Sequence, residues 1–200
     1  MTRLIFAAAL LLGLPACSSE PAGAPDVAAG ATNERRTSPA PAARSPAPVT
    51  PAAATPSGKT LTLEGLGVLK IGAAVPAWSG WAERGAQISD RCRTVSSPDF
   101  PGTYAIVEGG KGRRVTVGER SDVKLVEGIG TGATEAAVRA AFPGFREEPH
   151  KYVSAPGKYL TAPNAAAGDS ALRFEINADR KVSLVHVGTM PVLGYVEGCA

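Results

Sequence analysis

The sequence lacks the motifs of common catalytic, cofactor and metal sites. It has two histidines and three cysteines, with no Cys-x-x-Cys pair and no ligand spacing between His150 and His186. It has no Gly-x-Ser-x-Gly nucleophile elbow and no complete Gly-x-x-x-x-Gly-Lys-Ser/Thr phosphate-binding loop. We therefore expect no catalytic residue, no cofactor and no metal, and we predict that the protein is not an enzyme.

A large charge excess is also absent. The formal net charge is +3, and residues 61–200 carry 16 Lys and Arg against 15 Asp and Glu. No basic face interleaved with aromatic residues is visible, which argues against a nucleic-acid partner.

The sequence contains only one long apolar run. Leu4–Leu14 follows Arg3 and has about half the ~20 residues that a membrane-spanning helix needs, so residues 1–16 are predicted to be a signal peptide. The run ends in Leu14-Pro15-Ala16-Cys17, which resembles a bacterial lipobox. The resemblance implies a lipoprotein with palmitate on Cys17, held at the outer membrane and facing the periplasm. Ordinary secretion, with Cys17 merely near the cleavage site, is the alternative.

Residues 17–60 form the next region, composed largely of Ala, Pro, Ser, Thr and Gly. With almost no large apolar side chains, it cannot bury enough surface to offset the entropy of ordering its backbone. We predict a disordered tether. Its arginines make the tether basic and could contact peptidoglycan or an anionic surface. We favour the interpretation that they are solvated charges on a spacer.

Residues 61–200 are long enough for one domain with its own core. Cys92 and Cys199 remain if Cys17 carries lipid, and an even pair in an oxidising compartment predicts a disulfide, with two buried thiols as the alternative. Alternating apolar residues predict an α+β domain in which short helices pack on one face of an antiparallel sheet. The expected elements are strands near 61–70, 122–130 and 190–199, hairpins over 103–117 and 171–187, and helices over 134–142 and 76–84.

A glycine-rich segment, "VEGIGTGATEAAV" from Val126, resembles a dinucleotide-binding loop, but its Gly-x-Gly-x-Gly spacing is one residue short. "LEGLGVLKIGAAV" from Leu63 has the same Glu-Gly, aliphatic residue and glycine, which indicates an internal duplication with repeats starting near 63 and 126. In the second copy Thr134 is suited to cap the helix and Phe142 to anchor it in the core.

The paired pattern resembles the small two-repeat envelope proteins typified by the β-lactamase inhibitor protein and the BamE/SmpA lipoprotein. The run "GIGTGATEAAVRAAFPG … HKY … YL … LRFEI … EGC" also resembles uncharacterised proteobacterial lipoproteins. The wider resemblance implies protein-binding, assembly or inhibitor roles, with an envelope protein or cell-wall component as partner.

Six residues are candidates for a binding surface: Trp78, Trp81, His150, Tyr152, Lys158 and Tyr159. The two tryptophans are expected to pack their helix onto the sheet, unless Gly80 breaks that helix and exposes one of them. His186 is expected to be hydrogen-bonded and partly buried, and Arg113 and Arg114 to project into solvent. The competing hypothesis is an envelope hydrolase or carbohydrate- or peptidoglycan-binding protein; as a hydrolase it would use His150 or His186 with a carboxylate.

Overall fold

The computed structural model describes residues 58–199. The predicted signal peptide, the Cys17 lipidation site and most of the tether lie outside these residues. Within them, no helix has both the length and the apolar character needed to cross a membrane.

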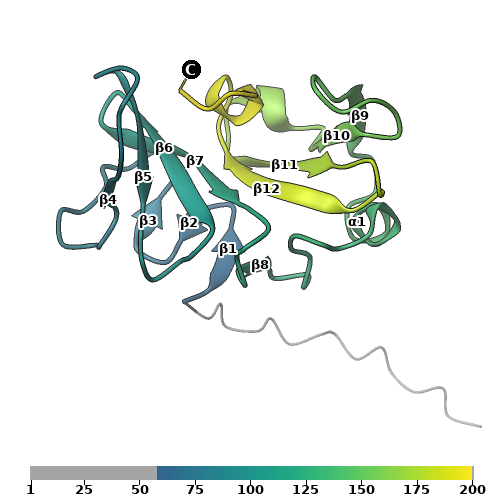
Figure 1. Cartoon of the computed structure of the whole chain (residues 1–200), viewed down its shortest axis with the longest axis horizontal. Helices are drawn as coiled ribbons and strands as arrows, with labels where there is room; N and C mark the ends of the chain where they lie inside the picture. The colour runs from purple at the N-terminus through teal and green to yellow at the C-terminus, as the bar shows by residue number, and fades with distance from the viewer. Residues whose placement is uncertain (1–57, 200) are drawn as a thin grey trace, which may run out of the picture. The chain divides into compact units, whose positions relative to one another are not determined.

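The largest element is an eight-stranded antiparallel sheet in the order β4-β5-β6-β7-β12-β11-β10-β9 (Figure 1). Its strands along the chain are β4 (Ala82–Glu83), β5 (Cys92–Ser96), β6 (Thr103–Glu108), β7 (Lys111–Val117), β9 (Arg146–Pro149), β10 (Lys158–Thr161), β11 (Ala171–Ile176) and β12 (Val182–Gly188). The predicted hairpins over 103–117 and 171–187 are confirmed as β6–β7 and β11–β12. The last strand β12 lies between β7 and β11, so segments distant in sequence meet at the centre of the sheet.

A smaller sheet has the order β3-β2-β1-β8. It contains β1 (Thr60–Thr62), β2 (Gly65–Leu66), β3 (Leu69–Lys70) and β8 (Lys124–Leu125). Strands β1 and β8 pair in parallel through Leu61 and Leu125. Strands β1 and β8 end just before the two similar segments, which begin at Leu63 and Val126.

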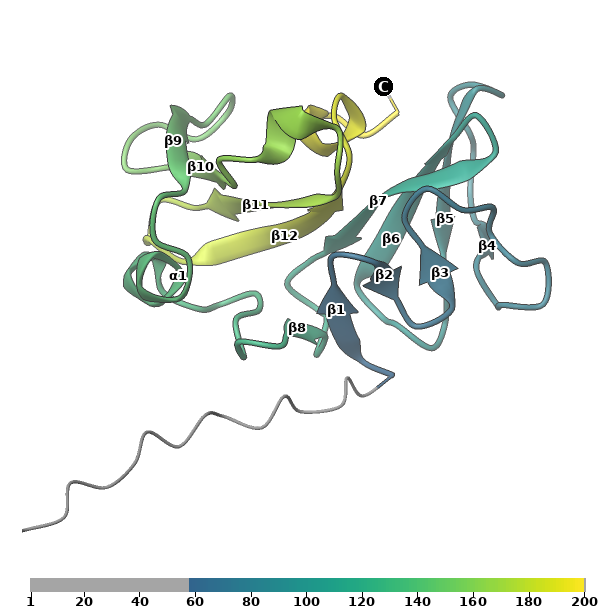
Figure 2. The ribbon, with the colours of Figure 1, turned by 180° about the vertical axis from the view of Figure 1, so that it is seen from behind.

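One face of the large sheet is apolar and forms the core. Leu172, Phe174 and Ile176 of β11 join Val185 and Val187 of β12 in one buried cluster, as their alternation predicts. Side chains from the small sheet and from α1 (Glu135–Ala141) belong to the same cluster. Figure 2 shows the small sheet and α1 on the lower side of the large sheet.

Helix α1 confirms the helix expected at 134–142. The Thr134 side chain accepts a hydrogen bond from the Ala137 N–H and caps the helix, and the Phe142 ring lies 5.4 Å from that of Phe174. The only other helical segments in residues 58–199 are two short 3-10 turns, η1 (Ala165–Ala167) and η2 (Val192–Gly194). The described fold is therefore mainly β, and a layer of helices over the sheet is not seen.

The helix expected at 76–84 is wrong. Gly80 has φ +71°, and the segment ends in strand β4. A left-handed backbone conformation at Gly80 is incompatible with a continuous helix. The segment that begins at Leu63 is therefore not followed by a helix, whereas the similar segment that begins at Val126 leads into α1.

The turn between β11 and β12 shifts the register by one residue near Glu175 and Ile176. Asn177 organises it, because its side-chain oxygen accepts hydrogen bonds from the N–H groups of Asp179 and Lys181. The bulge moves Val182 to the core face, where it is 2% exposed. Strict alternation along β12 would place Val182 on the same face as His186, and the bulge reverses this.

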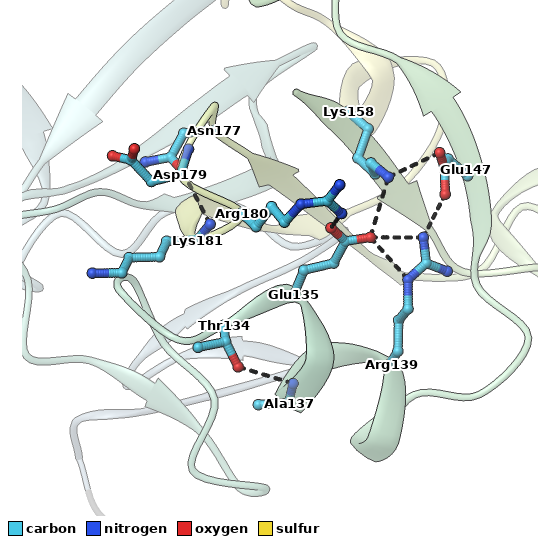
Figure 3. Close-up of polar contacts among 10 residues, drawn as sticks. All are labelled: Thr134, Glu135, Ala137, Arg139, Glu147, Lys158, Asn177, Asp179, Arg180 and Lys181. Carbon is cyan, nitrogen blue, oxygen red and sulfur yellow. Dashed lines mark hydrogen bonds and ion pairs between the residues drawn. The ribbon is translucent and has the colours of Figure 1, made fainter. Parts of the chain in front are cut away.

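Glu135, in the first turn of α1, joins the helix to the sheet through a charge cluster (Figure 3). Its carboxylate lies 2.9 Å from Arg139, 3.2 Å from Lys158 of β10 and 3.3 Å from Arg180 of the β11–β12 turn. Arg139 and Lys158 also pair with Glu147 of β9. Burial alone would raise the pKa of Glu135, but the hydrogen bonds from Arg139 and Lys158 outweigh it and lower that pKa.

We expect Glu135→Gln to lower the free energy of unfolding by about 2 kcal/mol, because a buried carboxylate with charged donors loses its charge. The matched control is Glu147→Gln, whose carboxylate is 50% exposed, and which should cost less than about 1 kcal/mol. Urea titrations of both variants measure the difference. Equal losses would show that the cluster acts as a solvated surface network.

Candidate functional site: a groove above a buried polar network

The second face of the large sheet carries a row of polar side chains across its central strands. One row of cross-strand neighbours runs from Thr161 through Arg173, His186 and Thr116 to Tyr104. The first four are at most 8% exposed. The 3-10 turn η2 contacts β7, β11 and β12, so this face is partly covered by the C-terminal segment. Buried polar groups on a sheet face must find hydrogen-bond partners within the protein.

A groove of about 990 Å³ opens on this part of the molecule. Its lining comes from the turn at 97–102, the loop at 118–120, the segment near 150–153 and strands β6, β11 and β12. The side chains that give it its chemistry are Arg84, Phe100, Tyr104, Arg120, His150 and Glu175. Such a mixture of aromatic and charged groups is typical of a surface that recognises a ligand by several contacts.

Glu175 links both histidines at the edge of the groove. Its Oε2 lies 3.1 Å from Nε2 of His150, and its Oε1 lies 3.1 Å from Nε2 of His186. Nδ1 of His186 lies 2.9 Å from the hydroxyl of Thr116. The sequence placed the two histidines in different segments, and β11 brings them to one carboxylate.

The hydrogen bonds fix the tautomers of both neutral imidazoles. Nδ1 of His150 accepts the N–H groups of Tyr152 and Val153, so the His150 proton sits on Nε2 and is donated to Glu175. An ionised Glu175 also accepts from Nε2 of His186, which leaves Nδ1 to accept the Thr116 hydroxyl proton. Every imidazole nitrogen and both carboxylate oxygens therefore have a partner within the network.

The electrostatics agree with an ionised Glu175 beside a neutral His186. Burial alone would raise the pKa of Glu175, but hydrogen bonds from His186 and His150 lower it overall. Burial lowers the pKa of His186, and the nearby charge of Arg114 acts in the same direction, against the effect of the hydrogen bond that His186 donates to Glu175. The buried imidazole therefore resists protonation.

Arg114 does not project into solvent, so that expectation is wrong. It is 1% exposed, and its guanidinium donates to the carbonyls of Val192 and Tyr195. Burial lowers the pKa of Arg114, although the nearby Tyr104 and Glu175 act to raise it. Because β7 alternates, Arg114 lies on the polar face of the sheet and fastens the C-terminal segment over it.

Three of the predicted binding residues lie near the network, but on two faces of the sheet. Tyr159 is 3% exposed and lies between the His150 ring, 4.5 Å away, and the Arg173 guanidinium, 4.1 Å away. Lys158 points to the other face and pairs with Glu135 and Glu147. The His150 side chain is 7% exposed, so it is buried beside Tyr159 and Glu175.

The other predicted binding residues are separate from one another. Trp81 is 5% exposed and stacks on Phe100, with ring centroids 5.6 Å apart, whereas Trp78 is 76% exposed. Tyr152 is 62% exposed and has the Lys151 ammonium 5.1 Å from its ring. The alternative considered for the tryptophans, in which Gly80 breaks the helix and exposes one of them, describes the structure.

Sequence reasoning missed Glu175, Arg173 and Thr116. The available signal was the alternation in "LRFEI" of β11, where Arg173 and Glu175 occupy the positions between the three core residues. A similar alternation in "RRVTV" of β7 marks Arg114 and Thr116. Two strands with polar residues at alternate positions indicate a sheet with a functional or covered second face.

Metal-binding chemistry has no support in residues 58–199, where no cluster of three or more His, Cys, Asp or Glu side chains could hold an ion. Comparison with known proteins gives no relative to guide the assignment. No protein-family model matches the chain, and no curated protein or solved structure is similar to it.

Proposed function

We propose that the protein is an envelope lipoprotein whose domain binds another envelope macromolecule through the groove above the polar sheet face. The observation that carries this proposal is the closed hydrogen-bond network at the groove, which offers shape and fixed polar groups without a free imidazole nitrogen. The predicted lipobox at Cys17 and the tether support the location, and the resemblance to two-repeat envelope proteins supports an assembly or inhibitor role.

The groove suits part of a larger ligand. Its volume of about 990 Å³ reaches the upper end of small-molecule sites, which span roughly 300–1,000 Å³. Phe100 and Tyr104 supply aromatic contact area, and Arg84 and Arg120 have exposed guanidiniums that form no ion pair within residues 58–199. Glu119 adds an opposite charge beside Arg120. Aromatic residues and arginine are the side chains most enriched at binding hot spots.

The second candidate is a hydrolase, favoured by the meeting of His150, Glu175 and His186. A carboxylate that is hydrogen-bonded to an imidazole supplies two members of a catalytic triad, the acid and the base that it orients. The third member is a nucleophile within about 3.2 Å of a free nitrogen of that imidazole. Here Nδ1 of His150 is occupied by two main-chain N–H groups and Nδ1 of His186 by Thr116, which favours binding.

Photocrosslinking in intact cells tests the binding proposal. A photoreactive residue is placed at Arg84 or Arg120, with Asp169 as a matched exposed control outside the groove. We expect the same crosslinked partner from both groove positions and none from Asp169. Crosslinks of equal strength from all three positions, or from Asp169 alone, would contradict a groove-directed partner.

Charge reversal then tests the contact itself. Arg120→Glu should weaken retention of the crosslinked partner by about tenfold or more, as expected for an interface arginine. Loss of palmitate labelling in Cys17→Ser checks the anchor separately. The hydrolase candidate is supported if the purified protein cleaves peptidoglycan, ester or peptide substrates and if His150→Ala abolishes the turnover.

A further inference from the structure

Strand β5, whose only outer neighbour is the short edge strand β4, differs from the other strands in how its outer main-chain groups are satisfied. Strand β4 is only two residues long and pairs with the end of β5, at Val95 and Ser96. Among the described residues, no main-chain hydrogen bond joins the segment 85–90 to β5. The first part of β5 therefore lacks a neighbouring strand on its outer side.

Side chains occupy the place of that strand. The carboxamide of Gln87 accepts the Thr94 N–H at 2.8 Å and donates to the Thr94 carbonyl at 3.3 Å. The Ser89 hydroxyl accepts the Cys92 N–H at 3.1 Å. Cys92 and Thr94 are two residues apart, which is the repeat of outward-facing groups along a strand. Gln87 and Ser89 thus make the hydrogen bonds that a ninth strand would make.

Two cavities flank this edge on opposite faces of the sheet. One, of about 410 Å³, is bordered by Val95 together with Val75, Pro76 and Trp81. The other, of about 300 Å³, is bordered by Thr94 and by the C-terminal segment that ends in Cys199. Successive residues of β5 face opposite sides, so Val95 and Thr94 mark the two faces.

The two most exposed large apolar side chains of the described residues lie in the segments beside this edge. Trp78 is 76% exposed and Ile88 is 69% exposed. Trp78 follows Ala77, which lines the larger cavity, although Trp78 itself is not part of that lining, and Ile88 borders the smaller cavity. Exposed apolar side chains of this size commonly mark an interaction surface.

We propose that β5 is a docking edge for an extended peptide segment of a partner protein, which adds a strand to the large sheet. The peptide main chain replaces Gln87 and Ser89 at Thr94 and Cys92. Its side chains alternate between the two cavities, with apolar residues toward Val75 and Trp81. Strand addition combines main-chain hydrogen bonds for affinity with pockets for alternate side chains, and both parts are in place here.

This site is distinct from the groove, so its test separates the two proposals. The full chain with Cys17→Ser, which cannot be lipidated, is used to select linear dodecapeptides from a displayed library. We expect enriched peptides with apolar residues at alternate positions. N-methylation at every second peptide position should weaken binding at least tenfold, while methylation at the intervening positions should not, because only alternate N–H groups face the protein.

Two protein variants complete the test. Gln87→Ala should tighten peptide binding about threefold, because the peptide no longer displaces the carboxamide, and Arg120→Glu in the groove should leave it unchanged. Amide exchange should show new protection at Cys92 and Thr94. The proposal is overturned if no linear peptide is enriched, if binding depends on Arg120 but not on Gln87, or if N-methylation acts uniformly. Self-association through β5 without peptide binding would also overturn it.

Discussion

Cys92→Ser is expected to lower the free energy of unfolding by about 4–5 kcal/mol, the largest effect that we anticipate for any single substitution. The Cys92–Cys199 disulfide that the sequence predicted is present, with Cα atoms 5.5 Å apart and a sequence separation of 107. In the chain-entropy model, opening a loop of this length releases the unfolded chain from its strongest constraint. The bridge also ties the C-terminal segment to strand β5.

A mutant cycle provides the control. Cys199→Ser should destabilise as much as Cys92→Ser, and the double variant should be no less stable than either one, because all three lose the same bond. The measurements are urea titrations in a Cys17→Ser background, with and without reductant. Additive losses, or a reductant effect in the double variant, would contradict a shared disulfide.

Glu175→Ala is the second substitution with a large expected effect, about 3 kcal/mol or more. Two buried imidazole N–H groups, from His150 and His186, would lose their acceptor, and each unsatisfied buried donor costs about 1–3 kcal/mol. Glu175→Gln is the matched control, since it keeps one acceptor oxygen and nearly the same volume. We expect it to cost less than Glu175→Ala. Equal and small losses would show that water replaces the carboxylate.

The network also predicts how stability depends on pH. The pKa of His186 is lowered by burial, so its contribution is complete above its ordinary value of 6.5 and is lost as pH falls through its lower folded pKa. The pKa of Glu175 is lowered too, and its contribution is lost as pH falls below its ordinary 4.5. Urea titrations from pH 8 to 5 should show falling stability in the wild type and a flatter profile for His186→Asn. A wild-type profile that rises toward pH 5 would contradict the assignment.

The parts of the fold that could be predicted from sequence are those decided locally or by covalent chemistry. Thr134 caps α1 because a threonine with a first-turn glutamate is a local signal, and the β11–β12 hairpin follows from the alternation around Leu172 and Phe174. The disulfide was predicted from the number of cysteines and from the expected oxidising compartment. The helix expected at 76–84 failed because Gly80 overrides the apolar spacing.

The candidate site could not be predicted because it depends on strand order. Thr116 and His186 are 70 residues apart and meet only because β7 pairs with β12. The one-residue bulge beside Glu175 then decides which residues of β12 lie on the same face of the sheet as Glu175. Neither the order of strands nor the bulge leaves a signal in composition or spacing. The polar positions were visible, but not their partners.

Both histidines are committed to a closed network, which leaves the groove a binding surface without a free imidazole nitrogen. Two-dimensional ¹H–¹⁵N NMR of the imidazole rings at pH 8 tests this arrangement directly. We predict that His150 and His186 are each a single neutral tautomer with the proton on Nε2 and with slow solvent exchange. A proton on Nδ1 in either ring, or a rapidly exchanging mixture of tautomers, would contradict it and restore the case for catalysis.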